Sequence, residues 1–310
     1  MNTPLEIDLY RLDRRAVLRN LALAAGVAGG SAILGRNLLG PDAAFAQDAT
    51  PTAQEFPPAG LPVLEVSVSA DFATTVSPEV QAGTLTLRAS SALEGYCDIL
   101  VLQVPDDVSD ADVEAAVNSD GTPEFLFRSI IAADISIEPG VTPSTIEAVI
   151  ELAPGTWYVA VVWDGPGSAT KIQAVGEAVT VPIEADVDVA YDHWDFSMPA
   201  EIAAGPMVWR VTNNDPVLHH MIIFSYPAAL NDEQVQSLLL AGEGMASPEA
   251  GLDLDSMIYR GGFGMISQGQ VMCQQQEFDP GYYFAVCYLS DPGSETPHVM
   301  LGMIESFTVA

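Results

Sequence analysis

Basic residues are scarce in this sequence. Ten Lys and Arg stand against 42 Asp and Glu, so the formal net charge at neutral pH is −32. A nucleic-acid binder that works by neutralising phosphates needs clustered positive charge, and so does a protein that docks on anionic lipid. The sequence therefore excludes both kinds of partner. Its acidity indicates either adaptation to high salt or a basic partner protein, and both interpretations stay open.

Cysteine and histidine are also rare, with three and four residues in 310. Three cysteines are too few for a scaffold built on disulfides. Four histidines exclude any site that needs many imidazoles. Hydrophobic residues, in contrast, make up 49% of the chain, which is enough for a sizeable core.

The first 46 residues resemble a twin-arginine export signal. Arg14 and Arg15 precede an apolar, Gly-rich run over residues 21–35, which is too short to be read first as a membrane span. Small residues at Ala44 and Ala46 suit a signal peptidase, so cleavage is expected after Ala46. An uncleaved N-terminal anchor is the second interpretation. Export would place the mature chain in the periplasm, at the cell envelope or outside the cell.

The remainder of the sequence repeats itself after a linker. Residues 47–60 are polar and Pro-rich and are expected to be flexible. Residues 88–105 then align without a gap with residues 210–227, and a Pro-Gly turn signal recurs further along both copies. Matches in the same order indicate two homologous domains, predicted at residues 61–184 and 185–310.

Both copies have the sequence pattern of β-strands. Apolar and polar residues alternate with period two over residues 63–68, 84–88 and 146–152. Helical periodicity is confined to short pieces near residues 109–118 and 231–241. Since Gly and Pro turns separate the short strands, the predicted fold class is all-β, with two tandem β-sandwiches.

Side chains with soft donor atoms gather in the second copy. His219 opens an apolar strand, Cys287 ends another, and His298 and Met303 follow within the next sixteen residues. Two imidazoles, one thiolate and one thioether suit copper that changes oxidation state, with methionine as a weak axial ligand. A hard cation would need oxygen donors instead.

These segments resemble the cupredoxin family of type 1 copper proteins. Residues 213–219 (NNDPVLH) are similar to the loop of the first ligand in that family. Residues 280–287 (PGYYFAVC) are similar to its penultimate strand, and residues 298–303 (HVMLGM) to its closing segment. The resemblance covers roughly residues 190–310.

The resemblance implies a Greek-key sandwich with one mononuclear type 1 copper site. The implied ligands are His219, Cys287, His298 and Met303. The interval from Cys287 to His298 is longer than in plastocyanin-like proteins, and the blue-copper domains of copper nitrite reductases resemble it in this respect. The departure concerns the geometry of the ligands more than their identity.

The first copy lacks these donors. Cys97 stands in the place of His219, and Val161 stands in the place of Cys287. Residues 171–176, where the closing segment should be, contain neither histidine nor methionine. The first sandwich is therefore expected to keep the fold without the metal.

A disulfide between Cys273 and Cys287 is a competing interpretation, because export permits one. It would remove the thiolate ligand. In the repeat alignment, however, Cys273 lies over Glu147 on the polar face of its strand, whereas Cys287 lies over apolar Val161.

Two other residues compete for ligand positions. His220 is an alternative to His219, but adjacent strand residues face opposite ways, so His220 is expected at the surface. Met300 is an alternative to Met303. His193 is expected to be an ordinary surface histidine.

Taken together, the sequence predicts an exported copper protein that carries one electron and meets a redox partner protein. A basic docking surface on that partner is one of the two interpretations of the acidity. A copper nitrite reductase or multicopper oxidase would need further imidazoles at a second copper centre, so the chain is not expected to be an enzyme. The alternatives are a non-redox copper carrier, or an adhesive sandwich with a vestigial site.

Overall fold

The structure is a computed structural model that describes residues 55–93, 95–119, 123–137, 145–163, 166–242, 247–294 and 296–310. These residues form mainly β-strands, which confirms the predicted all-β class. The predicted signal peptide and most of the predicted linker lie outside the described residues. In the part of the chain that is described, no helix has both the length and the apolar character needed to cross a membrane.

The described residues of the first half form eight strands and two short helical segments. Their bounds are β1 Val63–Val68, β2 Thr74–Val76, β3 Glu79–Ser91, β4 Cys97–Gln103, α2 Asp110–Val117, η2 Glu124–Arg128, β5 Ile130–Ile137, β6 Thr145–Leu152, β7 Gly155–Trp163 and β8 Ser168–Val179.

The described residues of the second half follow the same order of elements, with β11 and η4 in addition. Their bounds are β9 Val187–Asp192, β10 Asp195–Ser197, β11 Glu201–Ile202, β12 Gly205–Asn213, β13 His219–Tyr226, α3 Asp232–Gly242, η3 Leu254–Ser256, β14 Ile258–Ile266, β15 Val271–Phe278, β16 Gly281–Val286, η4 His298–Leu301 and β17 Ile304–Val309.

The strand pairing of the first half recurs in the second. β3 pairs with β1 in parallel and with β6 in antiparallel fashion, and β12 pairs in the same way with β9 and β15. β4 lies between β5 and β7, as β13 lies between β14 and β16. β8 and β17 complete the two sets beside β7 and β16. The two halves therefore share one plan of strand pairing, while the predicted domain bounds stay a prediction.

Local contacts also recur at equivalent positions. The Trp157 indole donates a hydrogen bond to the carbonyl of Ala153, four residues earlier, at 2.9 Å. The Tyr283 hydroxyl donates to the carbonyl of Asp279, also four residues earlier, at 2.7 Å. Each hydrogen bond holds a buried ring against the Pro-Gly turn that precedes its strand. The equivalent strands β7 and β16 therefore begin in the same way.

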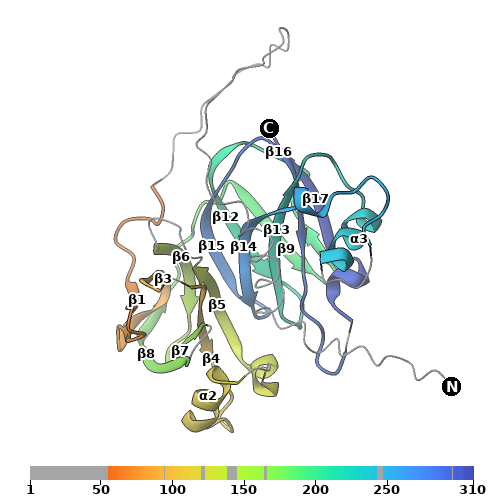
Figure 1. The fold of residues 1–310 in the computed structure, drawn as a ribbon. Helices are drawn as coiled ribbons and strands as arrows, with labels where there is room; N and C mark the ends of the chain where they lie inside the picture. Colours follow the sequence, from red (N-terminus) through yellow and green to blue (C-terminus); the bar gives the residue numbers. More distant parts are fainter. Residues whose placement is uncertain are drawn as a thin grey trace, which may run out of the picture.

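The two halves share one sheet. Antiparallel pairing joins residues 148–150 of β6 to residues 272–274 of β15. A twelve-stranded sheet therefore runs through both halves, and its main path is β10-β9-β12-β15-β6-β3-β8-β7-β4-β5. The second sheet has the order β11-β17-β16-β13-β14 and belongs to the second half alone (Figure 1). The sequence pattern does not predict this junction.

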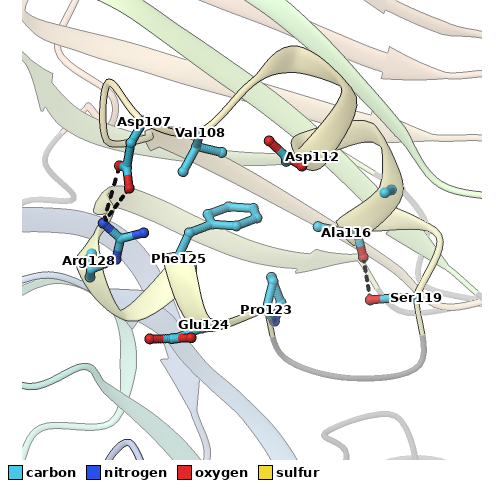
Figure 2. A pocket seen from close by; sticks show the side chains of 10 residues that line it. Asp107, Val108, Asp112, Ala116, Ser119, Pro123, Glu124, Phe125 and Arg128 are labelled. Atoms are coloured by element: carbon cyan, nitrogen blue, oxygen red, sulfur yellow. Dashed lines mark hydrogen bonds and ion pairs between the residues drawn. The ribbon is translucent and has the colours of Figure 1, made fainter.

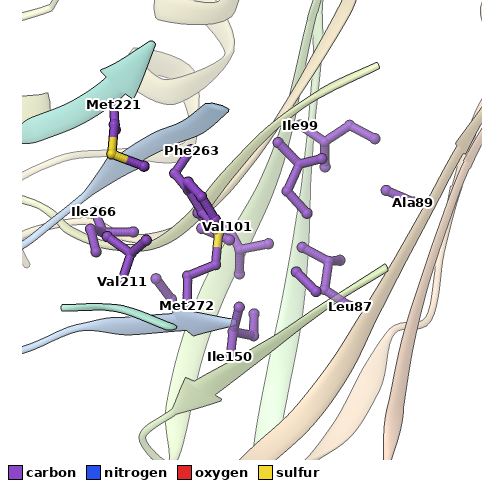
Figure 3. Close-up of a cluster of buried hydrophobic side chains, with 14 of the residues drawn as sticks. Leu87, Ala89, Ile99, Val101, Ile150, Val211, Met221, Phe263, Ile266 and Met272 are labelled. Carbon is purple, nitrogen blue, oxygen red and sulfur yellow. The ribbon is translucent and has the colours of Figure 1, made fainter. Parts of the chain in front are cut away.

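The hydrophobic core is continuous across the junction. One cluster contains Leu87, Ile99 and Ile150 of the first half together with Val211 and Met272 of the second (Figure 3). β5 and β14 also touch. The backbone N–H of Met265 donates to the Asp134 carboxylate at 2.9 Å. A Cβ atom at Gly264 would lie 1.9 Å from the Asp134 carbonyl oxygen, so this close approach requires glycine.

Candidate metal centre

Strand pairing in the smaller sheet brings the predicted donors to one end of the second half. β13, which begins at His219, pairs with β16, which ends one residue before Cys287. The loop after β16 then returns. The backbone N–H of His298 donates to the Leu289 carbonyl, and that of Val299 donates to the Cys287 carbonyl, both at 2.8 Å. These bonds place His298 beside Cys287 although ten residues separate them.

Three donor atoms converge in the interior. The Nδ1 atoms of His219 and His298 are 3.1 Å apart. The Sγ atom of Cys287 lies 3.4 Å from Nδ1 of His298 and 3.8 Å from Nδ1 of His219. The three residues are at most 1% exposed, and together they could hold one metal ion.

The spacing of these atoms fits a shared ion. Nitrogen and sulfur atoms bound to one ion at about 2.0–2.3 Å lie about 3–4 Å from each other at trigonal or tetrahedral angles. The observed separations fall in that range. A cation would also satisfy two imidazole nitrogens that otherwise face each other. Two nitrogens and a thiolate are the set that holds copper in trigonal sites, so the residues fit copper.

Burial sets the protonation of the donors in the metal-free protein. Desolvation lowers the pKa of His219 to about 4 and also lowers the pKa of His298. Desolvation raises the pKa of the Cys287 thiol to about 12, while the backbone N–H groups of His220 and Leu289 act against that rise. At neutral pH the imidazoles are therefore neutral and ready to bind, and a metal would have to displace the thiol proton.

The backbone of Met303 is hydrogen-bonded to two residues of the donor group, His298 and Cys287. Its backbone N–H donates to the His298 carbonyl at 3.0 Å, and its carbonyl accepts from the Cys287 N–H at 3.4 Å. Its side chain is fully buried in the main core cluster. Met300, in contrast, is 37% exposed and is not enclosed with the donors. The axial-ligand role of Met303 stays a prediction.

The loop before His219 is held by Asn213. The buried Asn213 amide donates to the carbonyls of Val217 and Ile266, both at 2.8 Å. Its side-chain oxygen accepts from the Asp215 N–H at 2.8 Å. One side chain therefore fixes both ends of the loop that delivers His219.

Sequence reasoning missed three residues around the donors. Trp194, in the turn between β9 and β10, lies against His298 with ring centroids 4.6 Å apart and edge-on to His219 at 6.2 Å. Asp215 and Asp291 lie near the outer nitrogens of the imidazoles, at 3.5 Å from His219 Nε2 and 3.4 Å from His298 Nε2. The only available signal was that both acids belong to loops flanking predicted ligands.

The expectation that His220 lies at the surface is wrong. His220 is only 2% exposed, and its Nε2 accepts a hydrogen bond from the Tyr288 N–H at 2.8 Å. β13 lies between β16 and β14, and its first six residues are buried on both faces, so neither His219 nor His220 meets solvent. His220 does not belong to the donor group. His193 is exposed, as predicted.

The alternative disulfide is also contradicted. Cys97, Cys273 and Cys287 are all free thiols. Cys273 lies on β15 in the large sheet, where it pairs with Val149 of β6, whereas Cys287 follows β16 in the small sheet. Cys273 is buried in a separate small cluster, because Ile183, Phe56 and Leu61 from segments outside the strands pack on a face that the alignment assigned to solvent.

No family model and no curated protein matches this chain. Solved structures show a distant likeness. A dithionite-reduced auracyanin from Roseiflexus castenholzii is 18% identical over 40% of this chain and 94% of its own, with a TM-score of 0.27. Auracyanin A from Chloroflexus aurantiacus, described as a "blue" copper protein, is 16% identical over 40% and 96%, with a TM-score of 0.26. The McoA multicopper oxidase from Aquifex aeolicus is 10% identical over 80% and 65%, with a TM-score of 0.22. At such scores the likenesses carry no weight, and any function has to rest on this chain's own residues.

Proposed function

We propose that this chain is a type 1 copper protein that carries one electron to or from a partner protein. The observation that carries the proposal is the buried triangle of His219 Nδ1, His298 Nδ1 and Cys287 Sγ, with sides of 3.1, 3.4 and 3.8 Å. Copper bound there would supply a single-electron couple. Met303 is the proposed axial ligand.

The protein framework would keep the donors fixed while the oxidation state changes. His219 and Cys287 are attached to paired strands, and His298 is tied to Cys287 through the returning loop. Such a site needs little rearrangement when one electron arrives or leaves, which is what an electron carrier requires. Burial of all three donors keeps water away from the ion.

Burial of the three donors favours a carrier over an enzyme. Among the described residues, a cavity of about 470 Å³ lies between α2 and η2 in the first half (Figure 2). Phe125 and the Asp107–Arg128 ion pair line it, and none of its lining residues belongs to the donor group. In the same described residues, His219, Cys287 and His298 form the one His, Cys and carboxylate group suited to a metal.

Export and a basic partner are further parts of the proposal. The twin-arginine pattern supports export, and the mature chain that cleavage would leave has 38 acidic and five basic residues. A positively charged partner would be steered toward such a surface, and salt would weaken that steering. Reduction by hexaammineruthenium(II), a cationic one-electron donor, should therefore slow as ionic strength rises. An unchanged rate would count against electrostatic docking.

The test of the copper centre is visible absorbance after loading with Cu(II). The wild-type protein should develop an intense band from the copper–thiolate bond. Cys287→Ser should abolish the band, whereas Cys97→Ser and Cys273→Ser should keep it, because those thiols lie outside the donor group. A copper-loaded but colourless wild type would overturn the proposal. Tight Cu(I) binding that survives Cys287→Ser would point instead to a copper carrier.

A further inference from the structure

A carboxylate faces the outer nitrogen of each candidate ligand imidazole. Asp215 Oδ2 lies 3.5 Å from His219 Nε2, and Asp291 Oδ1 lies 3.4 Å from His298 Nε2. The Asp215 side chain is 7% exposed and that of Asp291 is 35% exposed. Both imidazoles thus have the same surroundings, with an acid at Nε2 and the donor triangle at Nδ1.

Among the residues that the structure describes, neither outer nitrogen has a better partner than the carboxylate that faces it. Both Nε2 atoms are buried and make no hydrogen bond of good geometry to any described group, and the carboxylates are the charged groups that lie near them. A carboxylate oxygen can only accept, and a neutral imidazole has one N–H to donate. The arrangement therefore favours the proton on Nε2 and leaves the lone pair of Nδ1 directed at the triangle.

Asp215 is fixed rather than loosely placed. Its backbone N–H donates to Asn213 Oδ1 at 2.8 Å, and its own Oδ1 accepts from the Val217 N–H at 3.3 Å. Oδ2 is then left to face His219. It also lies 3.8 Å from Nδ1 of the exposed His193.

The half of the chain that lacks the ligand imidazoles also lacks the carboxylates that face them. The gap-free alignment that places Cys97 over His219 places Leu93 over Asp215, so the first half lacks the acid together with the imidazole. Leu93 there packs against the core cluster. Asp291, for its part, belongs to the long interval between Cys287 and His298. The strand framework therefore does not require either carboxylate.

We infer that Asp215 and Asp291 are positioning residues for the metal centre: they hold the Nε2 protons of His219 and His298, direct both Nδ1 atoms inward, and add negative charge that favours the oxidised ion. The inference rests on the proposed function for the last of these effects only. Outer carboxylates of this kind orient a ligand imidazole and raise its basicity.

The electrostatic effect has a definite sign. A negative charge stabilises the doubly charged ion more than the singly charged one, so it lowers the reduction potential. The effect is only weakly screened, because Asp215 is buried and the Trp194 ring covers His298. Removing either charge should therefore raise the potential.

The first experiment uses the metal-free protein and reads the imidazole tautomers by ¹⁵N NMR. Both His219 and His298 should carry the proton on Nε2. Asp291→Asn should keep the Nε2–H form of His298, because an amide oxygen still accepts, whereas Asp291→Leu should give a mixture of tautomers. A wild-type protein with the proton on Nδ1, or an Asp291→Leu variant without any change, would overturn the positioning role.

The second experiment measures the copper couple by redox titration. At a fixed solution potential, Asp291→Asn should raise the Cu(I) to Cu(II) ratio about tenfold, which is about 59 mV for a one-electron couple. Asp215→Asn should act in the same direction. Asp195→Asn is the matched control, because it removes an equal charge from an exposed position in β10 and should change the ratio less than twofold. Equal effects in all three variants would overturn the electrostatic role. A colourless wild type would sink the proposed function, yet the tautomer experiment would still decide the positioning role.

Discussion

The two halves of this chain use one strand plan and differ where donor atoms meet. β4 beside β7 and β13 beside β16 are equivalent pairs, yet the first pair carries Cys97 and Val161 where the second leads to His219 and Cys287. Cys97 and Val161 are buried in the core cluster. The same strand arrangement forms with Cys97 and Val161 at these positions. The two imidazoles and the Cys287 thiol of the second half are therefore not there for packing alone.

Copper loading offers the largest test of that contrast. Free Cu(II) at a thousand times its dissociation constant should raise the free energy of unfolding by about 4 kcal/mol, because the ion binds only the folded state. Urea unfolding with and without copper measures the gain. His298→Gln should abolish most of it, whereas Gln274→Ala, on a strand outside the donor group, should keep it. The same gain in His298→Gln would show that copper binds elsewhere.

The junction between the halves can be broken at Gly264. Gly264→Ala should lower the free energy of unfolding by about 3 kcal/mol, because the new Cβ would overlap the Asp134 carbonyl and push β14 away from β5. Chemical denaturation measures the loss. Gly95→Ala is the control, since a Cβ at Gly95 has no neighbouring atom within 4 Å. Equal stability of the two variants would contradict the close contact.

Acid should weaken the second half of the metal-free protein selectively. The pKa of His219 is about 4 in the folded protein against an ordinary 6.5, so between these values the unfolded chain binds more protons. Stability is therefore fully present above pH 6.5 and falls by up to about 3 kcal/mol as the pH drops to 4. Urea unfolding at pH 7.5, 6 and 5 measures the slope. His219→Gln should reduce the slope without abolishing it, because burial also lowers the pKa of His298. All four histidines follow residue 190, so the first half has no equivalent group. A slope unchanged in the variant would assign it to other residues.

The smallest expected effect concerns the hydrogen bonds that hold the buried rings of Tyr283 and Trp157 at equivalent positions. Tyr283→Phe removes one hydrogen bond to the Asp279 carbonyl and should cost about 1 kcal/mol. Trp157→Phe removes the equivalent bond to Ala153 but also shrinks a buried ring, so its cost should be larger. Thermal unfolding of both variants gives the ranking. A negligible cost for Tyr283→Phe would mean that the bond is not part of the shared plan.

Much of the fold was predictable because period two and recurring turns report strands directly. The meeting of His219, Cys287 and His298 was implied by the resemblance of their segments to the cupredoxin family, and the structure brings the three side chains together. The burial of His220 and Cys273 was not predictable, since it depends on which distant segments pack on their faces of the sheets. Trp194 and Asp291 reach the site from loops, and no periodicity governs where a loop side chain lies.

The backbone pairing of β6 with β15 ties the two halves together through one sheet. A protein that gripped the donor-free half would therefore meet the copper end at one distance and one angle each time. With such a geometry, the half without donors would act as a rigid docking surface. It would select partner proteins by their orientation as well as by their charge.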